Sequence, residues 1–273
     1  MRVDFPLRHP YIALALAFVA GVNCDASAQD ATGPDRTNVI QMTRLDAAPT
    51  IDGIIDASEW AGAATVDRAL VQFQPEFGEP SPYRTVVRIG QTASALYVAF
   101  ESFDPDMPRL STSRTQRDSH LDHDDSVFIL LDTFADRRTA YLFGTNALAT
   151  QLDARIADNG RTEDDRWDTA WRSAATRQSD RWVAEFEIPL SSLKFETGSE
   201  RTWGVNFVRT VPRRKEKSVW SGPGESLLRV SSFGELRDLE IQEQQDSWQF
   251  IPYALAAVEK GKGTDFEAGL DVR

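Results

Sequence analysis

Few of the residues that usually carry catalysis or covalent cross-links occur in this sequence. The 273 residues include one cysteine, Cys24, and three histidines. Cys24 lies in a segment that we expect to be removed on export, so the exported chain needs no disulfide framework. No GxSxG nucleophile elbow occurs, and the Gly261-Lys262-Gly263 turn lacks the rest of a phosphate-binding loop. These absences disfavour an enzyme.

The hydrophobic run near the N-terminus is too short to span a bilayer. The segment YIALALAFVAGV follows Arg2 and Arg8, and Ala26-Ser27-Ala28 has the small-x-small form of a cleavage site. This pattern predicts that residues 1–28 are an export signal and that the mature chain begins near Gln29. A lipid anchor on Cys24 is the alternative, which Asn23 disfavours because a small residue is wanted there.

Basic residues are too few to balance the acidic ones. Thirty Lys and Arg stand against 42 Asp and Glu, which gives a formal charge of −12. Such a surface repels phosphate backbones, so nucleic acid is excluded as a partner. The content of 41% hydrophobic and 10% aromatic residues is enough for a folded core, which excludes a disordered chain.

Helical periodicity is nearly absent, and segments rich in β-branched and aromatic residues recur between polar turns. We expect an all-β protein in which two antiparallel sheets pack as a sandwich. One short helical piece is expected at residues 56–64, with Asp56 as its cap and Trp60 closing the end of the core. The predicted strands are NVIQMTRL, YRTVVRIG, ALYVAFESF, SVFILLDT, TAYLFGTNA, TQLDARIAD, DTAWRSAATR, RWVAEFEIPL, WGVNFVRTV and GELRDLEI.

Tryptophan provides two kinds of candidate position. Trp182 and Trp203 fall on the apolar side of alternating strands, which predicts that they belong to the core. Trp220, in SVWSGPG at the end of a strand, is the better candidate for an exposed ring. An exposed indole can stack on the apolar face of a sugar, although a loop tryptophan more often covers a core.

The stretch HLDHDDSVFILLDT allows two interpretations. Asp122, Asp124 and Asp125, with two nearby histidines, could bind a cation, since oxygen ligands suit calcium and imidazoles suit zinc. The spacing fits neither an EF-hand nor an HExxH helix. The interpretation that explains more is structural: VFILL is apolar on both faces, which predicts a central strand, and the acids mark its end.

Residues 247–273 differ from the preceding part. After the polar residues QEQQD, an aromatic-rich strand meets the Gly-Lys-Gly turn and a second strand begins. We expect a C-terminal β-hairpin that is unfinished, because a lone two-stranded ribbon is marginal in water.

Motifs over residues 48–241 together resemble the family 9 carbohydrate-binding modules. They are APTIDGIIDASEW, VVRIGQTASALYVAFESFD, DDSVFILLDT, YLFGTNALATQLDARI, WVAEFEIPLSSLKF, WGVNFVRT, VWSGPG and FGELRDLEI. The resemblance implies a jelly-roll-like sandwich that binds sugars and carries structural calcium. The sequence is similar in particular to the N-terminal domain of a bacterial outer-membrane barrel family of unknown function, in which a segment like residues 247–273 opens the barrel.

The sequence departs from the sugar-binding members of that family at three positions. Those members sandwich a terminal sugar between two tryptophans, which fall here at Asp122 and Leu227. An arginine that they use falls at Gly144. The resemblance therefore carries the fold more firmly than it carries sugar binding.

The resemblance implies a division of the chain and a function. We expect an export signal at 1–28, a carbohydrate-binding-module-like sandwich at 38–242, and the start of a barrel region at 247–273. The expected function is non-catalytic glycan binding in carbohydrate catabolism, in the periplasm or outer membrane of a Gram-negative bacterium. The candidate ligand-binding residues are Trp220, Asn146, Asn206 and Arg209.

Two other functions stay open. The sandwich could be a structural or partner-binding domain that caps the barrel without a sugar ligand, which the missing tryptophan pair favours. It could also be a component of a glycoside hydrolase, since carboxylates are abundant, although that abundance singles out no pair.

Overall fold

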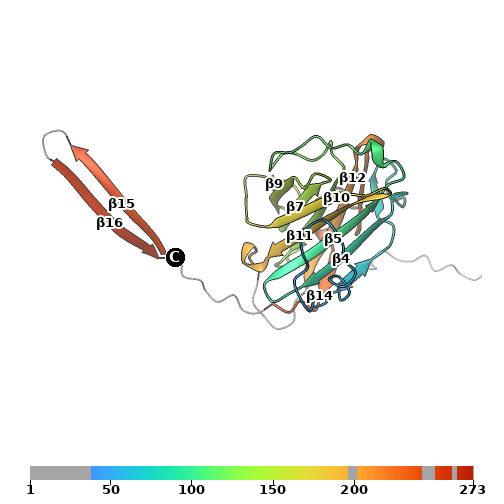
Figure 1. Ribbon diagram of the computed structural model, residues 1–273, viewed down its shortest axis with the longest axis horizontal. Coiled ribbons are helices and arrows are strands. Elements are labelled where there is room, and N and C mark those ends of the chain that lie inside the picture. Colours follow the sequence, from blue (N-terminus) through green and yellow to red (C-terminus); the bar gives the residue numbers. More distant parts are fainter. Residues whose placement is uncertain (1–37, 196–201, 242–249, 260–262, 273) are drawn as a thin grey trace, which may run out of the picture. The chain divides into compact units, whose positions relative to one another are not determined.

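Strands make up almost all of the regular structure, which confirms the all-β prediction. The computed structural model describes residues 38–195, 202–241, 250–259 and 263–272 (Figure 1). Within those residues the only helical elements are four single 3₁₀ turns, η1 Met107–Arg109, η2 Leu190–Ser192, η3 Pro212–Arg214 and η4 Val230–Ser232. None of the helical elements in this part of the chain is long and apolar enough to cross a membrane.

The larger sheet has nine strands, in the order β1-β14-β12-β6-β7-β8-β9, with β13 paired to β12 and β3 paired to β13. All its pairs are antiparallel except β1 with β14. Its strands are β1 Val39–Gln41, β3 Val71–Gln74, β6 Ser126–Asp132, β7 Ala140–Asn146, β8 Gln151–Ala157, β9 Thr162–Asp164, β12 Trp203–Val211, β13 Glu216–Val219 and β14 Gly234–Arg237.

The smaller sheet has five antiparallel strands in the order β10-β11-β5-β4-β2. They are β2 Ala64–Val66, β4 Thr85–Gln91, β5 Ala95–Phe103, β10 Arg172–Arg177 and β11 Arg181–Pro189. The two sheets form the two layers of the sandwich (Figure 1). The predicted antiparallel sandwich is therefore confirmed.

Alternate residues of the strands fill the space between the sheets. Phe100 packs against Phe186 and Phe207, with ring centroids 5.6 and 5.8 Å apart. Trp182 and Trp203 are both buried in this cluster, as the alternation predicts. The burial of several aromatic rings removes a large apolar area from water, which is the main stabilising contribution to such a core.

The larger sheet is apolar on its outer face as well. β6 lies at its centre, between β12 and β7, as the VFILL pattern predicts. Its inward residues join the inter-sheet core, whereas Leu130 belongs to a second buried cluster that Phe128 packs against. Segments that connect the strands cover this second cluster and contribute Leu121, Val230 and Phe233 to it.

The outer face of the smaller sheet is covered by residues that precede β2. Trp60 is buried there against Tyr97 and Ala99, and its indole Nε1 donates to Glu185 Oε1 over 3.0 Å. The short helix predicted for residues 56–64 is wrong, because the structure has turns that lead directly into β2. Asp56 still accepts a hydrogen bond from the Ser58 amide over 2.7 Å, as a capping side chain would.

The C-terminal hairpin pairs β15, Phe250–Glu259, with β16, Gly263–Val272, in antiparallel register. Both predicted strands of this hairpin are present. The sandwich strands run from Val39 to Arg237, within the predicted domain 38–242. The predicted export signal, residues 1–28, lies outside the described residues.

Candidate functional site

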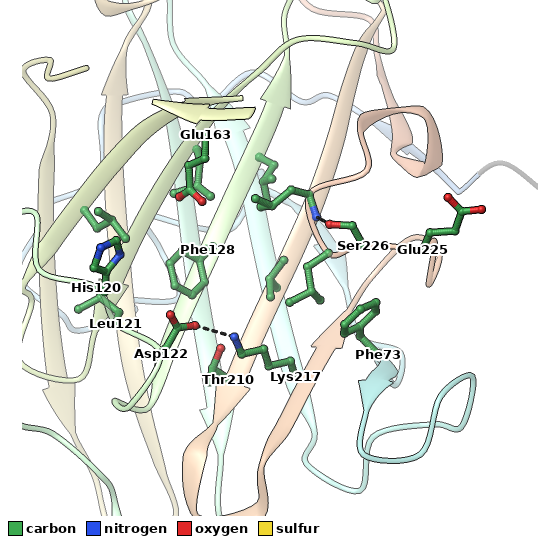
Figure 2. Close-up of a pocket in the computed structure, with 16 residues that line it drawn as sticks. Phe73, His120, Leu121, Asp122, Phe128, Glu163, Thr210, Lys217, Glu225 and Ser226 are labelled. Atoms are coloured by element: carbon green, nitrogen blue, oxygen red, sulfur yellow. Dashed lines mark hydrogen bonds and ion pairs between the residues drawn. The ribbon is translucent and has the colours of Figure 1, made fainter. Parts of the chain in front are cut away.

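A pocket of about 340 Å³ opens on the outer face of the larger sheet (Figure 2). Its floor is apolar because the outward residues of four neighbouring strands are apolar. Alternation on β6, β7, β8 and β12 turns these side chains away from the inter-sheet core. The floor residues are Phe128, Leu130, Leu142, Leu152 and Val208.

Phe128 and Gly144 are register partners on β6 and β7. The Phe128 ring lies over Gly144, so that a Cβ at position 144 would be 2.3 Å from Phe128 Cδ1. No side chain fits at Gly144 while the ring stays there. The position at which the resembling family carries an arginine is therefore part of an apolar surface in this protein.

The segment from Ser111 to Asp125 forms one wall of the pocket. The Asp124 carboxylate fixes it by accepting hydrogen bonds from the amides of Ser113 and Arg114. Asn146 donates to Asp124 Oδ2 and to the Arg114 carbonyl, each over 2.8 Å. These buried contacts place His120, Leu121 and Asp122 at the pocket.

The segment from Ser221 to Phe233 forms the opposite wall. At its start, Asn206 donates to the Ser221 carbonyl and accepts from the Ser221 amide, both over 2.9 Å. Near its end, Asn159 exchanges two hydrogen bonds with Ser231. Gly160 has a φ of +88°, and a Cβ there would lie 2.2 Å from the Leu228 carbonyl oxygen, so this close approach requires glycine. These contacts hold residues 225–228 over the pocket.

Charged groups surround the pocket opening. Lys217 on β13 donates to Asp122 Oδ1 over 2.5 Å (Figure 2). Glu225 pairs with Arg229 at 2.7 Å. The Glu163 side chain extends from β9 towards Phe128 (Figure 2), and its carboxyl group has no hydrogen-bond partner among the described residues. Desolvation raises the pKa of Glu163, whereas the hydrogen bond from Lys217 lowers the pKa of Asp122.

Aromatic rings extend the pocket on the side of β3. Phe73 lines the pocket, and Phe77 packs edge-on against it with a centroid distance of 6.2 Å. Phe77 is 62% exposed. The two rings form an apolar surface that continues from the wall into solvent.

The four predicted ligand-binding residues are all buried. Trp220 is 3% exposed and packs on Phe207, so its predicted exposure is wrong. Arg209 points between the sheets and donates to the carbonyls of Arg84 and Phe103. Asn146 and Asn206 face outwards, but their amides hold the two walls. Ligand binding by these four residues stays a prediction.

The predicted metal-ligand residues do not point at a common centre. Asp122 pairs with Lys217, Asp124 accepts amide hydrogen bonds, and Asp125 Oδ2 accepts from the Ser111 amide over 2.7 Å. Among the described residues, no group of three His, Cys, Asp or Glu side chains has the geometry to hold a metal ion. Calcium binding stays a prediction.

Asp125 belongs to a buried charge network at one end of the sandwich. Arg213 Nη2 donates to both carboxylate oxygens of Asp104, over 2.5 and 2.6 Å, and Arg213 Nη1 lies 3.9 Å from Asp125 Oδ1. Burial raises the pKa of Asp125 to about 6 and lowers that of Arg209 to about 10. This network holds neighbouring loops together, and none of its members is among the residues that line the pocket.

Solved structures of other proteins share the fold of this chain. No protein-family model and no curated protein matches the sequence. Two solved structures of a family 9 carbohydrate-binding module from Caldicellulosiruptor kristjanssonii, in complex with glucose and with cellotriose, match with TM-scores of 0.50. They are 18% and 17% identical, and each match covers 77% of this chain and 98% or 96% of the other.

A candidate carbohydrate-binding protein from Bacteroides uniformis matches with a TM-score of 0.58 and 14% identity. That match covers 74% of this chain and 99% of the other. The sandwich has the fold of these modules. The fold expected from the resemblance is therefore confirmed.

The pH dependence of stability tests the buried network. The pKa of Asp125 is about 6 in the folded protein, against an ordinary value of 3.8, so the folded state holds a proton that the unfolded chain has lost between these values. The unfolding free energy of the wild type, relative to that of Asp125→Asn, should fall by up to about 3 kcal/mol as the pH rises from 4 to 7. Above pH 7 the difference should change little. Urea unfolding of both proteins at several pH values measures this difference in unfolding free energy.

Asp67→Asn is the control of opposite sign. The hydrogen bond from Arg84 lowers the pKa of Asp67, so its contribution is lost as the pH falls. A stability difference between wild type and Asp125→Asn that stays constant from pH 4 to 7 would contradict the assignment of Asp125.

The role of Asn206 as a wall anchor gives a second prediction. Asn206→Ala removes both partners of the Ser221 backbone, and each unsatisfied buried group costs about 1–3 kcal/mol. We expect the unfolding free energy to fall by about 2–4 kcal/mol and amide exchange to accelerate at Ser221. Thr210→Val, on the same face of β12, should leave exchange at Ser221 unchanged, and equal exchange in Asn206→Ala and wild type would reject the anchor role.

Proposed function

We propose that this protein is a non-catalytic carbohydrate-binding module whose saccharide site is the pocket on the outer face of the larger sheet. The observation that carries the proposal is the combination of an aromatic and aliphatic floor with a polar rim, on the fold of family 9 carbohydrate-binding modules. Two of the solved neighbours are complexes with glucose and cellotriose, which supports a saccharide as the ligand class.

The chemistry of the pocket suits the two surfaces of a sugar. The C–H face of a pyranose is apolar and packs on an aromatic ring, here Phe128 or Phe73. Sugar hydroxyls are donors and acceptors, and the rim offers the carboxylates of Asp122 and Glu163 and the ammonium group of Lys217. Asp122 and Leu227, where the resembling family has its tryptophans, both line this pocket.

A partner-binding domain without a sugar ligand is the second candidate. The observation that favours it is the exposed ring of Phe77 beside Phe73, because exposed apolar side chains next to a pocket are typical of protein interfaces as well as ligand sites. The two functions differ in whether isolated saccharides bind to the chain.

Calorimetric titration of the protein with glucose and with cellotriose tests the module. We expect binding of at least one of them, and at least five-fold weaker binding by Phe128→Ala, because loss of the ring contact corresponds to about 1 kcal/mol. Phe134→Ala removes a ring from the loop between β6 and β7 and should leave the affinity unchanged. Absence of binding to both sugars, or equal affinity of Phe128→Ala and wild type, would contradict the proposed site.

We also propose that the protein is exported and that the sandwich is the N-terminal domain of an outer-membrane barrel protein. The signal pattern before Gln29 and the resemblance support this assignment. N-terminal sequencing of the protein from a Gram-negative host should find Gln29 as the first residue in the periplasmic or outer-membrane fraction. An intact Met1 in the cytoplasmic fraction would contradict export.

A further inference from the structure

We propose that the pocket selects saccharides that carry an uncharged apolar substituent, such as an aryl or acyl group, and that this substituent occupies the floor. The inference rests on the proposed function and names the ligand class of the same site. It assigns the aliphatic side chains of the floor to the substituent, the Phe128 ring to the C–H face of the sugar, and the rim to the sugar hydroxyls.

The floor offers no hydrogen-bonding group to a ligand. The five side chains that form it, from Phe128 on β6 to Val208 on β12, are hydrocarbon, and the backbone of these strands is paired in the sheet. A sugar hydroxyl that reached the floor would lose its hydrogen bonds with water without gaining a partner, which is unfavourable. An aryl or acyl group placed there would instead gain from leaving water.

Phe128 also prevents the floor from acquiring a polar group at its centre. Its ring covers Gly144, where a Cβ would lie 2.3 Å from Cδ1. The polar side chains nearest to the floor are therefore those at its edges. Figure 2 shows Glu163 on one side of Phe128 and the Asp122–Lys217 pair on the other.

The rim charges select against anionic ligands. Among the residues that line the pocket, Asp122, Glu163 and Glu225 are acidic, and Lys217 is the one Lys or Arg. Lys217 is already paired with Asp122, so its charge is not free for a ligand carboxylate. Carboxylates accept hydrogen bonds from hydroxyls, and a charged sugar acid would meet like charge. The ligand is accordingly a neutral glycoside or ester.

The ring pair Phe73 and Phe77 continues the apolar surface beyond the pocket. Phe73 is a wall residue, and Phe77 lies next to it in solvent. A planar substituent longer than one ring would remain in contact with aromatic carbon as it leaves the pocket. This continuity favours an aryl group over a short alkyl group.

Calorimetric titration of the full chain with four probes tests the inference. They are methyl β-D-glucopyranoside, phenyl β-D-glucopyranoside, phenyl β-D-glucuronide and benzyl alcohol. We expect phenyl glucoside to bind at least five-fold more tightly than each of the other three. Methyl glucoside lacks the ring, benzyl alcohol lacks the sugar, and the glucuronide adds a negative charge.

The outcomes separate this inference from the proposed function. If methyl and phenyl glucoside differ by less than five-fold, the apolar subsite is rejected while sugar binding stands. If benzyl alcohol binds as tightly as phenyl glucoside, the sugar contributes nothing, and both proposals fail. If the glucuronide binds within five-fold of the glucoside, the neutral-ligand assignment fails. If no probe binds at a concentration of about 10 mM, both proposals are rejected.

A matched pair of variants locates the substituent. Val208 lines the pocket, and Val219 is its register partner on β13, buried in the same cluster but not at the pocket. Val208→Thr adds a hydroxyl to the floor and should weaken phenyl glucoside binding at least three-fold while methyl glucoside is unaffected. Val219→Thr should change neither. Circular dichroism confirms that both variants are folded, and equal effects of the two substitutions would overturn the placement on the floor.

Discussion

The larger sheet is apolar on both faces, and most features of the molecule follow from that constraint. One face is buried by the smaller sheet, so the other must be covered by the segments between strands. The wall segments at Ser111–Asp125 and Ser221–Phe233 provide this cover. They stop short of full coverage, and the part of the apolar face that they leave open is the pocket.

The buried side-chain amides of Asn146 and Asn206 hold the two wall segments in position over the sheet. Asn146 is the last residue of β7, and Asn206 lies in the middle of β12. Both side chains face outwards, and each forms hydrogen bonds with backbone groups of one wall. A loop over an apolar face has few backbone partners of its own, and unpaired buried backbone groups are costly. Both residues were predicted to bind a ligand directly, which stays a prediction, and the structure shows that both contact the walls of the pocket. From the sequence alone, a polar residue on a strand is therefore compatible either with ligand binding or with anchoring a loop.

The sequence allowed all ten predicted strands to be located, because hydrophobic alternation reports which face a strand buries. It did not reveal β2, β3, β9 or β13. β13 begins with Glu216 and Lys217, whose charges hide the strand pattern, and Glu216 is buried through contacts with Ser81 from a distant part of the chain. Because β3 and β13 were missed, Phe73 and Lys217 were absent from the predicted site. Trp220 was misplaced for a similar reason, since its burial depends on Phe207 and Arg68.

The central claim is that a saccharide binds on the outer face of the larger sheet. Methyl NMR of the full chain, with labelled Leu, Val and Ile, tests it most directly during titration with cellotriose. We expect shifts for the outward methyl groups of Leu130, Leu142 and Leu152, with little change for Ile129 and Leu131 on the inner face. Shifts confined to another surface, such as that around Ile54 and Trp60, or no shifts at saturating sugar, would contradict it.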